Sequence, residues 1–140
     1  MKTFLITGAS TGIGAATARA AAEAGYRVVL AARSTDKIEA LAEELDGLAV
    51  TCDVTEWADQ ESLVKTALDA YGRIDVAFAN AGFGGPRGFD QGDVEDWKAM
   101  VLTNVYGCAL TIRATMGPLK ESKGHLLLTG SVAGRRALKG

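Results

Sequence analysis

Histidine, cysteine and aromatic side chains are scarce in this sequence of 140 residues, and their scarcity excludes several kinds of site. His125 is the only histidine, and Cys52 and Cys108 lie far apart without a Cys-x-x-Cys pair. A structural zinc site therefore lacks ligands, and we expect no metal site. We expect both cysteines to be small buried hydrophobic residues in a reducing compartment.

Long apolar runs and a strong net charge are also missing. No apolar stretch approaches the roughly 18 residues that a membrane helix requires, and the stretch after Met1 is too short for a signal peptide. A net charge of −2 provides no basic surface for nucleic acid. With 48% hydrophobic and 23% charged residues, the composition excludes a disordered chain. We therefore expect a cytoplasmic globular protein whose residues 1–140 form a single domain.

Short apolar runs alternate with helical patterns along the whole chain. The apolar runs cover 3–7, 26–32, 48–52, 74–79 and 124–129, and the helical patterns cover 13–24, 35–45, the residues between Thr55 and Gly72, and 94–119. Nearly continuous apolar runs are typical of parallel strands that are covered on both faces. Crossovers of helical length predict right-handed connections between them. The order predicts an α/β fold with a doubly wound parallel sheet.

Helix ends are marked by familiar residues. Gly25 and Gly72 suit the ends of two helices, and Ser34 or Thr35 and Thr55 suit the starts of two others. The Gly117-Pro118 pair predicts that the last helix bends or stops there.

The segment from Thr7 to Gly14, Thr-Gly-Ala-Ser-Thr-Gly-Ile-Gly, joins the first predicted strand to the first predicted helix. A glycine turn that opens a helix points free backbone N–H groups and the positive helix end at one spot, which suits an anion. Glycines at 8, 12 and 14 permit a tight turn, the approach of a pyrophosphate, and close packing of helix on strand. The alternative is a glycine-rich turn that only packs.

This motif resembles that of the short-chain dehydrogenase/reductase family, and further sites around Asp53, Asn80, Asn104 and Ser131 agree with the family. The resemblance implies a Rossmann-like sheet of strand order 3-2-1-4-5 that binds NAD(P). It also implies an oxidoreductase that transfers hydride between a nicotinamide and a carbonyl or secondary alcohol substrate. The cofactor-binding residues expected from the motifs are Gly8, Ser10, Thr11, Gly12, Ile13, Gly14, Asp53, Val54, Asn80, Ala81 and Gly82.

The resemblance also implies a role for each of the four further sites. Asp53 would contact the adenine, Asn80 would brace the sheet, Asn104 would help to anchor a proton-relaying water, and Ser131 would hydrogen-bond the substrate oxygen. Each residue by itself has a structural alternative: in the same order, a turn residue, a loop amide, a helix-bending polar group and a strand-end hydroxyl.

Arg33 decides the expected cofactor. Folds that prefer NAD place a carboxylate at the end of the second strand, but here that strand ends in two alanines and is followed by Arg33. A guanidinium can pair with a 2′-phosphate through two hydrogen bonds, which favours NADP over NAD. Ser10, Thr11 and Ser34 are possible additional donors, and the alternative for Arg33 is a solvated residue at a helix start.

The family's catalytic Tyr-x-x-x-Lys pair is not found, because Tyr26, Tyr71 and Tyr106 all lack a lysine four residues later. The resemblance places that tyrosine about four residues past Gly140, together with further helices and strands. We therefore expect these residues to be the amino-terminal part of a longer enzyme, incomplete at the C-terminus and inactive alone. The alternatives are a non-catalytic NAD(P)-binding module and an inert fragment.

The substrate is defined only as a small carbonyl or alcohol compound. Arg87 or Arg135 could recognise a carboxylate near the expected site, the alternative being solvated loop cations. Relatives are often homodimers or homotetramers built on the long fourth helix, here 94–119, so an oligomer is expected for the complete protein.

Overall fold

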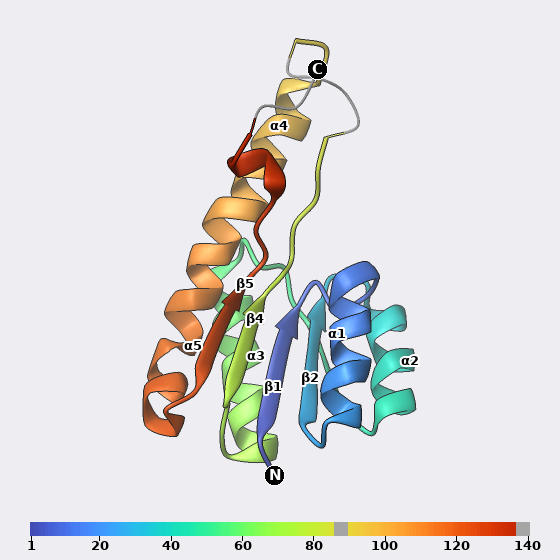
Figure 1. The fold of residues 1–140 in the computed structure, drawn as a ribbon, viewed down its shortest axis with the longest axis vertical. Helices are drawn as coiled ribbons and strands as arrows, with labels where there is room; N and C mark the ends of the chain where they lie inside the picture. Colours follow the sequence, from blue (N-terminus) through green and yellow to red (C-terminus); the bar gives the residue numbers. More distant parts are fainter. Residues whose placement is uncertain (86–89, 137–140) are drawn as a thin grey trace.

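The computed structural model describes residues 1–85 and 90–136 and shows a five-stranded parallel sheet (Figure 1). The strands are β1 (Thr3–Thr7), β2 (Arg27–Ala32), β3 (Leu48–Thr51), β4 (Val76–Ala79) and β5 (His125–Leu128). Their order is β3-β2-β1-β4-β5, so the predicted fold class and strand order are confirmed.

Helices connect the strands and cover both faces of the sheet (Figure 1). They are α1 (Gly12–Glu23), α2 (Thr35–Leu45), α3 (Trp57–Tyr71), α4 (Val94–Val101), the π-helix η1 (Leu102–Gly107), α5 (Cys108–Ser122) and the short 3-10 helix η2 (Val132–Gly134). No helix within the described ranges is both long and apolar enough to cross a membrane.

Alternate residues of β1 point into two separate cores. Phe4 and Ile6 pack with α1 and α2 on one face, whereas Leu5 packs with α3 and α5 on the other. Every residue of β1 is buried, which explains why this strand lacks the polar alternation of a sheet with one wet face. β5 is different: it lies at an edge of the sheet, and Leu128 at its end is 52% exposed.

Two expected helix ends differ in the structure. The helix does not stop at Pro118 but continues to Ser122, and the alternative of a bend at Pro118 stays a prediction. Leu119 is buried in the core and the Ser122 hydroxyl donates to the Ile74 carbonyl at 2.7 Å, so contacts beyond the proline hold the last turn. Thr55 does not cap α3, because Glu56 occupies the N-cap position and the Thr55 hydroxyl donates to Asp53 instead.

Candidate functional site

A cavity of about 900 Å³ lies at the carboxyl ends of the strands, where ligands bind in open α/β sheets. Every predicted site residue except Gly14 lines it: Gly8, Ser10, Thr11, Gly12, Ile13, Arg33, Asp53, Val54, Asn80, Ala81, Gly82, Asn104 and Ser131. The volume is within the range of roughly 300–1,000 Å³ that is usual for ligand pockets. Six segments of the chain that are distant in sequence therefore meet around one space.

The three glycines of the first turn differ in what surrounds them. A side chain on Gly14 would place its Cβ 2.2 Å from the Gly8 carbonyl oxygen, so Gly14 allows α1 to pack against the end of β1. Gly8 has a φ of +65° and a Cβ there would lie 2.7 Å from the Ala81 Cα. Gly12 has a φ of +56° with open space where a Cβ would be. The backbone of the turn is thus unobstructed at Gly12, which lines the cavity.

Asn80 ties the ends of three strands together. Its Nδ2 donates to the carbonyls of Thr7 and Gly8 at 3.2 and 3.3 Å, and its Oδ1 accepts a bond from the Thr129 hydroxyl at 2.8 Å. The Thr7 hydroxyl accepts from the backbone N–H groups of Asn80 and Ala81 at 3.1 and 3.2 Å. These bonds join the ends of β1, β4 and β5 and fix the wall of the cavity, so Asn80 braces the sheet.

Asp53 forms a turn at the cavity. Its Oδ1 accepts from the backbone N–H of Thr55 at 3.0 Å and from the Thr55 hydroxyl at 2.8 Å. The Thr55 backbone bond lowers the pKa of the Asp53 carboxyl most; burial acts against it, and the Thr55 hydroxyl and the charge of Arg33 add to the lowering. Asp53 is therefore both the turn residue of the alternative interpretation and a cavity residue, and its contact with adenine stays a prediction.

Asn104 holds the segment that follows β4. Its Oδ1 accepts from the Phe83 N–H at 3.0 Å and its Nδ2 donates to the Phe83 carbonyl at 2.8 Å. A Cβ on Gly82 would lie 2.9 Å from the same Oδ1, so a glycine is needed beside it. Asn104 lies in η1, and π-helical turns are often found at functional sites. Both amide atoms are used by Phe83, and a role in anchoring water stays a prediction.

Ser131 lies directly before η2 and is exposed to the cavity. Its hydroxyl oxygen accepts from the Ala133 backbone N–H at 3.1 Å. Because the oxygen is held as an acceptor, the hydroxyl hydrogen can be donated to another group. Arg135, one candidate for carboxylate recognition, is exposed and does not line the cavity, and Arg87 lies outside the described residues.

Several cavity residues were not predicted from the sequence. Thr129 and both cysteines line the space, and so does Phe83, from a loop that was expected to border the site. Burial raises the pKa of the Cys52 thiol to about 12, with smaller contributions from Asp59 and Asp53, and burial also raises the pKa of Cys108. Both thiols are therefore neutral near pH 7 and act as apolar wall. The signal for Thr129 was its place at the end of the fifth strand, level with Asn80 on the neighbouring strand.

A hydrogen-bond network behind the cavity sets the position of η1. The buried Gln60 donates through Nε2 to the Val54 carbonyl at 3.0 Å and to the Thr111 hydroxyl at 2.8 Å. A Cβ on Gly107 would lie 2.6 Å from the Val54 Cγ2, so η1 can approach the loop after β3 only with glycine there. This network was not predicted, because Gln60 and Thr111 are 51 residues apart and belong to no motif.

The fold and the cavity define a class: an α/β protein with a dinucleotide-binding turn at the point where the strand order reverses. The turn offers backbone at Gly12 without a side chain in the way, and the two helix N-caps Thr11 and Ser34 face the same space. These features fit the diphosphate and ribose of a dinucleotide.

The family model for short chain dehydrogenases matches residues 2–140, and the chain belongs to the short-chain dehydrogenase/reductase family. An uncharacterized oxidoreductase of Listeria monocytogenes is 35% identical over 145 residues, which cover 99% of this chain and 58% of the relative. The chain thus spans about 60% of the length of this relative and of a similar uncharacterized oxidoreductase of Staphylococcus haemolyticus.

Two solved structures show the same arrangement. The alcohol dehydrogenase of the archaeon Thermococcus sibiricus, complexed with 5-hydroxy-NADP, has a TM-score of 0.94 at 36% identity, over 99% of this chain and 61% of that one. A short-chain dehydrogenase/reductase from Burkholderia phymatum, in complex with NAD, has a TM-score of 0.92 at 30% identity, over 98% of this chain and 51% of that one.

Proposed function

We propose that this chain forms the coenzyme site of an NADP-dependent oxidoreductase that acts on a small carbonyl or secondary alcohol compound. The observation that carries the proposal is the single cavity in which the glycine-rich turn, Arg33, Asn80 and Ser131 meet. When bound, the nicotinamide would supply or accept the hydride.

The residues present support binding and orientation of both partners. The turn at Gly12 receives the diphosphate through backbone N–H groups, and Asn80 keeps the ends of β1 and β4 at a fixed separation. Ser131 donates its hydroxyl hydrogen to the substrate oxygen and stabilises the charge that develops there. In the family that this chain resembles, a Tyr-x-x-x-Lys pair exchanges the proton, and these 140 residues contain no tyrosine with a lysine four residues later.

NADP is favoured over NAD by the chemistry at the end of β2. Arg33 follows Ala32, lines the cavity and is exposed, and no carboxylate occupies the end of that strand. An NAD-preferring site needs an acceptor for the ribose 2′-OH, whereas a guanidinium suits a 2′-phosphate. The Thermococcus relative, solved with an NADP analogue, supports this choice.

An oligomer is proposed as well, a homodimer or homotetramer in the complete protein. The support is the apolar exposure along the helical run from α4 to α5, where Val105 is 65% and Met116 is 40% exposed. Light scattering on the purified protein measures its mass directly.

The proposal is tested by hydride transfer in the full-length protein, followed as NADPH oxidation at saturating coenzyme with a panel of aldehydes and ketones. Ser131→Ala is expected to lower turnover about 100-fold or more, because one donor to a developing oxyanion is removed. NADPH affinity is expected to change little. Equal turnover in the variant would refute the role of Ser131, and a protein that binds NADPH without any turnover would favour the non-catalytic module.

A further inference from the structure

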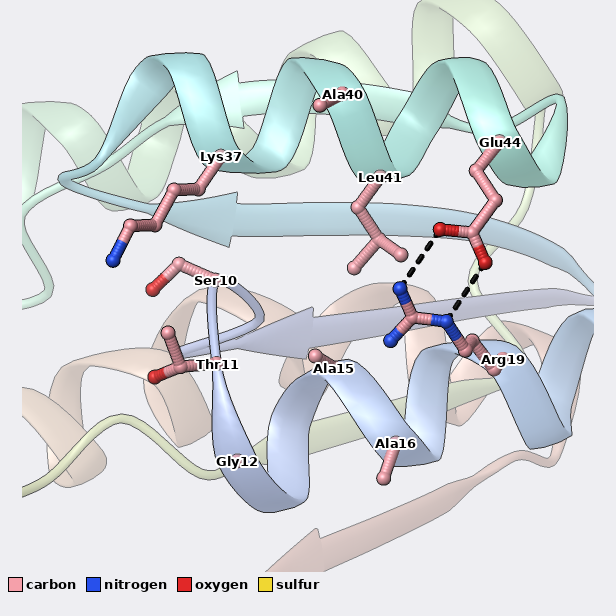
Figure 2. Close-up of a pocket in the computed structure, with 10 residues that line it drawn as sticks. All are labelled: Ser10, Thr11, Gly12, Ala15, Ala16, Arg19, Lys37, Ala40, Leu41 and Glu44. Atoms are coloured by element: carbon pink, nitrogen blue, oxygen red, sulfur yellow. Dashed lines mark hydrogen bonds and ion pairs between the residues drawn. The ribbon is translucent and has the colours of Figure 1, made fainter.

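A second hollow, called the groove below, adjoins the coenzyme cavity and runs between α1 and α2 (Figure 2). Its volume is about 550 Å³, and Ser10, Thr11 and Gly12 line both spaces. The glycine-rich turn is therefore the shared rim of two hollows. Lys37, in the first turn of α2, lines this second hollow and does not line the coenzyme cavity.

The two cations of the groove are not equivalent. Arg19 is held by Glu44 through two bonds, from Nε to Oε1 at 2.7 Å and from Nη2 to Oε2 at 2.8 Å, so its charge is compensated. Lys37 is exposed and makes no hydrogen bond or ion pair with any residue that the structure describes. Figure 2 shows its side chain directed toward the end of the groove at Ser10 and Thr11, away from Glu44.

Three hydroxyls that line the coenzyme cavity, those of Ser10, Thr11 and Ser34, also make no side-chain bond within the described part of the chain, and the first two line the groove as well. Thr11 and Ser34 occupy the N-cap positions of α1 and α2, yet neither side chain caps its helix. The Ser10 hydroxyl likewise has no hydrogen-bond partner among residues 1–85 and 90–136. Serine and threonine at an N-cap usually bond the N–H groups of the next turn, so hydroxyls that do not are available as donors to a bound group.

We propose that Lys37 binds the 2′-phosphate of NADP at this rim, together with Arg33, and so helps to select NADP over NAD. The inference rests on the proposed coenzyme and adds a residue to it. Arg33 lines the coenzyme cavity and Lys37 lines the groove, and Ser10, Thr11 and Gly12 line both, so each cation shares a space with the rim. A phosphate dianion there would be placed between two positive charges and three hydroxyl donors, whereas the 2′-OH of NAD would offer little to attract the ammonium.

The test compares Kd values for NADPH and NADH on the full-length protein, measured by titration calorimetry. The variants are Lys37→Gln, Lys37→Arg and, as a control with the same loss of charge far from the cavity, Lys120→Gln in the last turn of α5. Lys37→Gln is expected to weaken NADPH binding about three- to tenfold and to leave NADH binding within about twofold. Lys37→Arg keeps the charge and is expected to retain the preference, and Lys120→Gln is expected to change neither Kd.

A second pair of probes removes the nicotinamide from the comparison. The fragment 2′,5′-ADP carries the 2′-phosphate and 5′-AMP lacks it, so only the first is expected to bind Lys37→Gln more weakly than wild type. Raising the salt concentration is expected to reduce the difference in 2′,5′-ADP affinity between wild type and Lys37→Gln, because the Lys37 ammonium and the phosphate would meet in a solvent-exposed place.

The possible results separate this inference from the function on which it depends. If wild type prefers NADPH and Lys37→Gln changes its Kd no more than Lys120→Gln does, the inference is overturned and the proposed coenzyme stands. If wild type binds both dinucleotides alike, the inference and the choice of NADP both fail. If wild type binds neither, the proposed function fails with them.

Discussion

Gly12 and Gly14 stand two residues apart in the coenzyme turn, and alanine at each is expected to damage a different property. At Gly14 the new Cβ would lie 2.2 Å from the Gly8 carbonyl oxygen and 2.8 Å from the Asn80 Nδ2. The nearer atom is backbone and cannot swing away, so α1 or the turn must move. Overpacking of this kind costs typically 1–3 kcal/mol, and we expect about 3 kcal/mol for Gly14→Ala.

Gly12→Ala is expected to cost little stability and to weaken NADPH binding strongly. Nothing lies within 4 Å of a Cβ there, so the cost is the positive φ of +56°, about 1 kcal/mol. The Cβ would, however, stand where the turn faces the cavity, and we expect NADPH affinity to fall at least tenfold. Gly117→Ala serves as the control, since it lies inside α5 with open space around it and an ordinary φ, and it is expected to raise stability by up to about 1 kcal/mol.

Urea unfolding gives the three free energies of unfolding, and titration with NADPH gives the three affinities. Wild-type stability in Gly14→Ala would show that helix and strand do not need the close approach. Wild-type affinity in a folded Gly12→Ala would show that this turn does not receive the diphosphate, and the proposed function would lose its central contact.

Two further predictions concern the bonds that hold the sheet. Asp75 is buried and accepts from the Thr3 N–H at 2.9 Å and from the Arg73 Nε at 2.8 Å, and these bonds, with that of Arg73 the largest influence, keep the pKa of its carboxyl below the ordinary value. A lowered folded-state pKa means that the stabilisation is complete above the unfolded value of about 3.9 and is lost as the pH falls through the folded value. Asp75→Asn is therefore expected to lose stability at pH 7 and to flatten the acid limb of the unfolding curve; an unchanged limb would contradict this. Asn80→Ala removes three side-chain bonds and is expected to cost about 2–4 kcal/mol in urea unfolding, and a loss below about 1 kcal/mol would show that Asn80 does not brace the sheet.

The order of strands and helices and the glycine-rich turn after β1 could be predicted from the sequence, because both depend on local patterns. The run from Thr3 to Thr7 is apolar on both faces, and the helix that follows Gly12 begins where the glycine motif predicts. The cavity walls at Asp53 and Ser131 could be placed because parallel strands end at one edge. The expectation that both cysteines are buried is met by Cys52, whereas Cys108 is only partly buried.

What could not be predicted depends on contacts between distant segments. The hydroxyl of Thr55 was expected to cap a helix, but an acceptor at Asp53 two residues earlier competes for it. The helix at Pro118 continues because Ser122 bonds to Ile74, a residue 48 positions away. The π-helical turn around Asn104 has no local signature, since it is set by the fit of Gly107 against Val54 and of Gln60 against Thr111.

The position of the site follows from the same bonds that close the fold. β1 lies between β2 and β4, and the chain winds outward in one direction from β1 to β3 and in the other from β4 to β5. The loops after β1 and β4 therefore diverge, and the space between them would widen or collapse without a fixed separation.

Thr7 and Asn80 set that separation by bonding each other's backbone across the junction. Because Thr129 joins the same group from β5, the hydroxyl of Ser131 two residues later is held at a set place relative to the turn. A substitution in this group is thus expected to affect coenzyme binding and stability together, whereas changes at Arg33 or Lys37 are expected to affect binding alone.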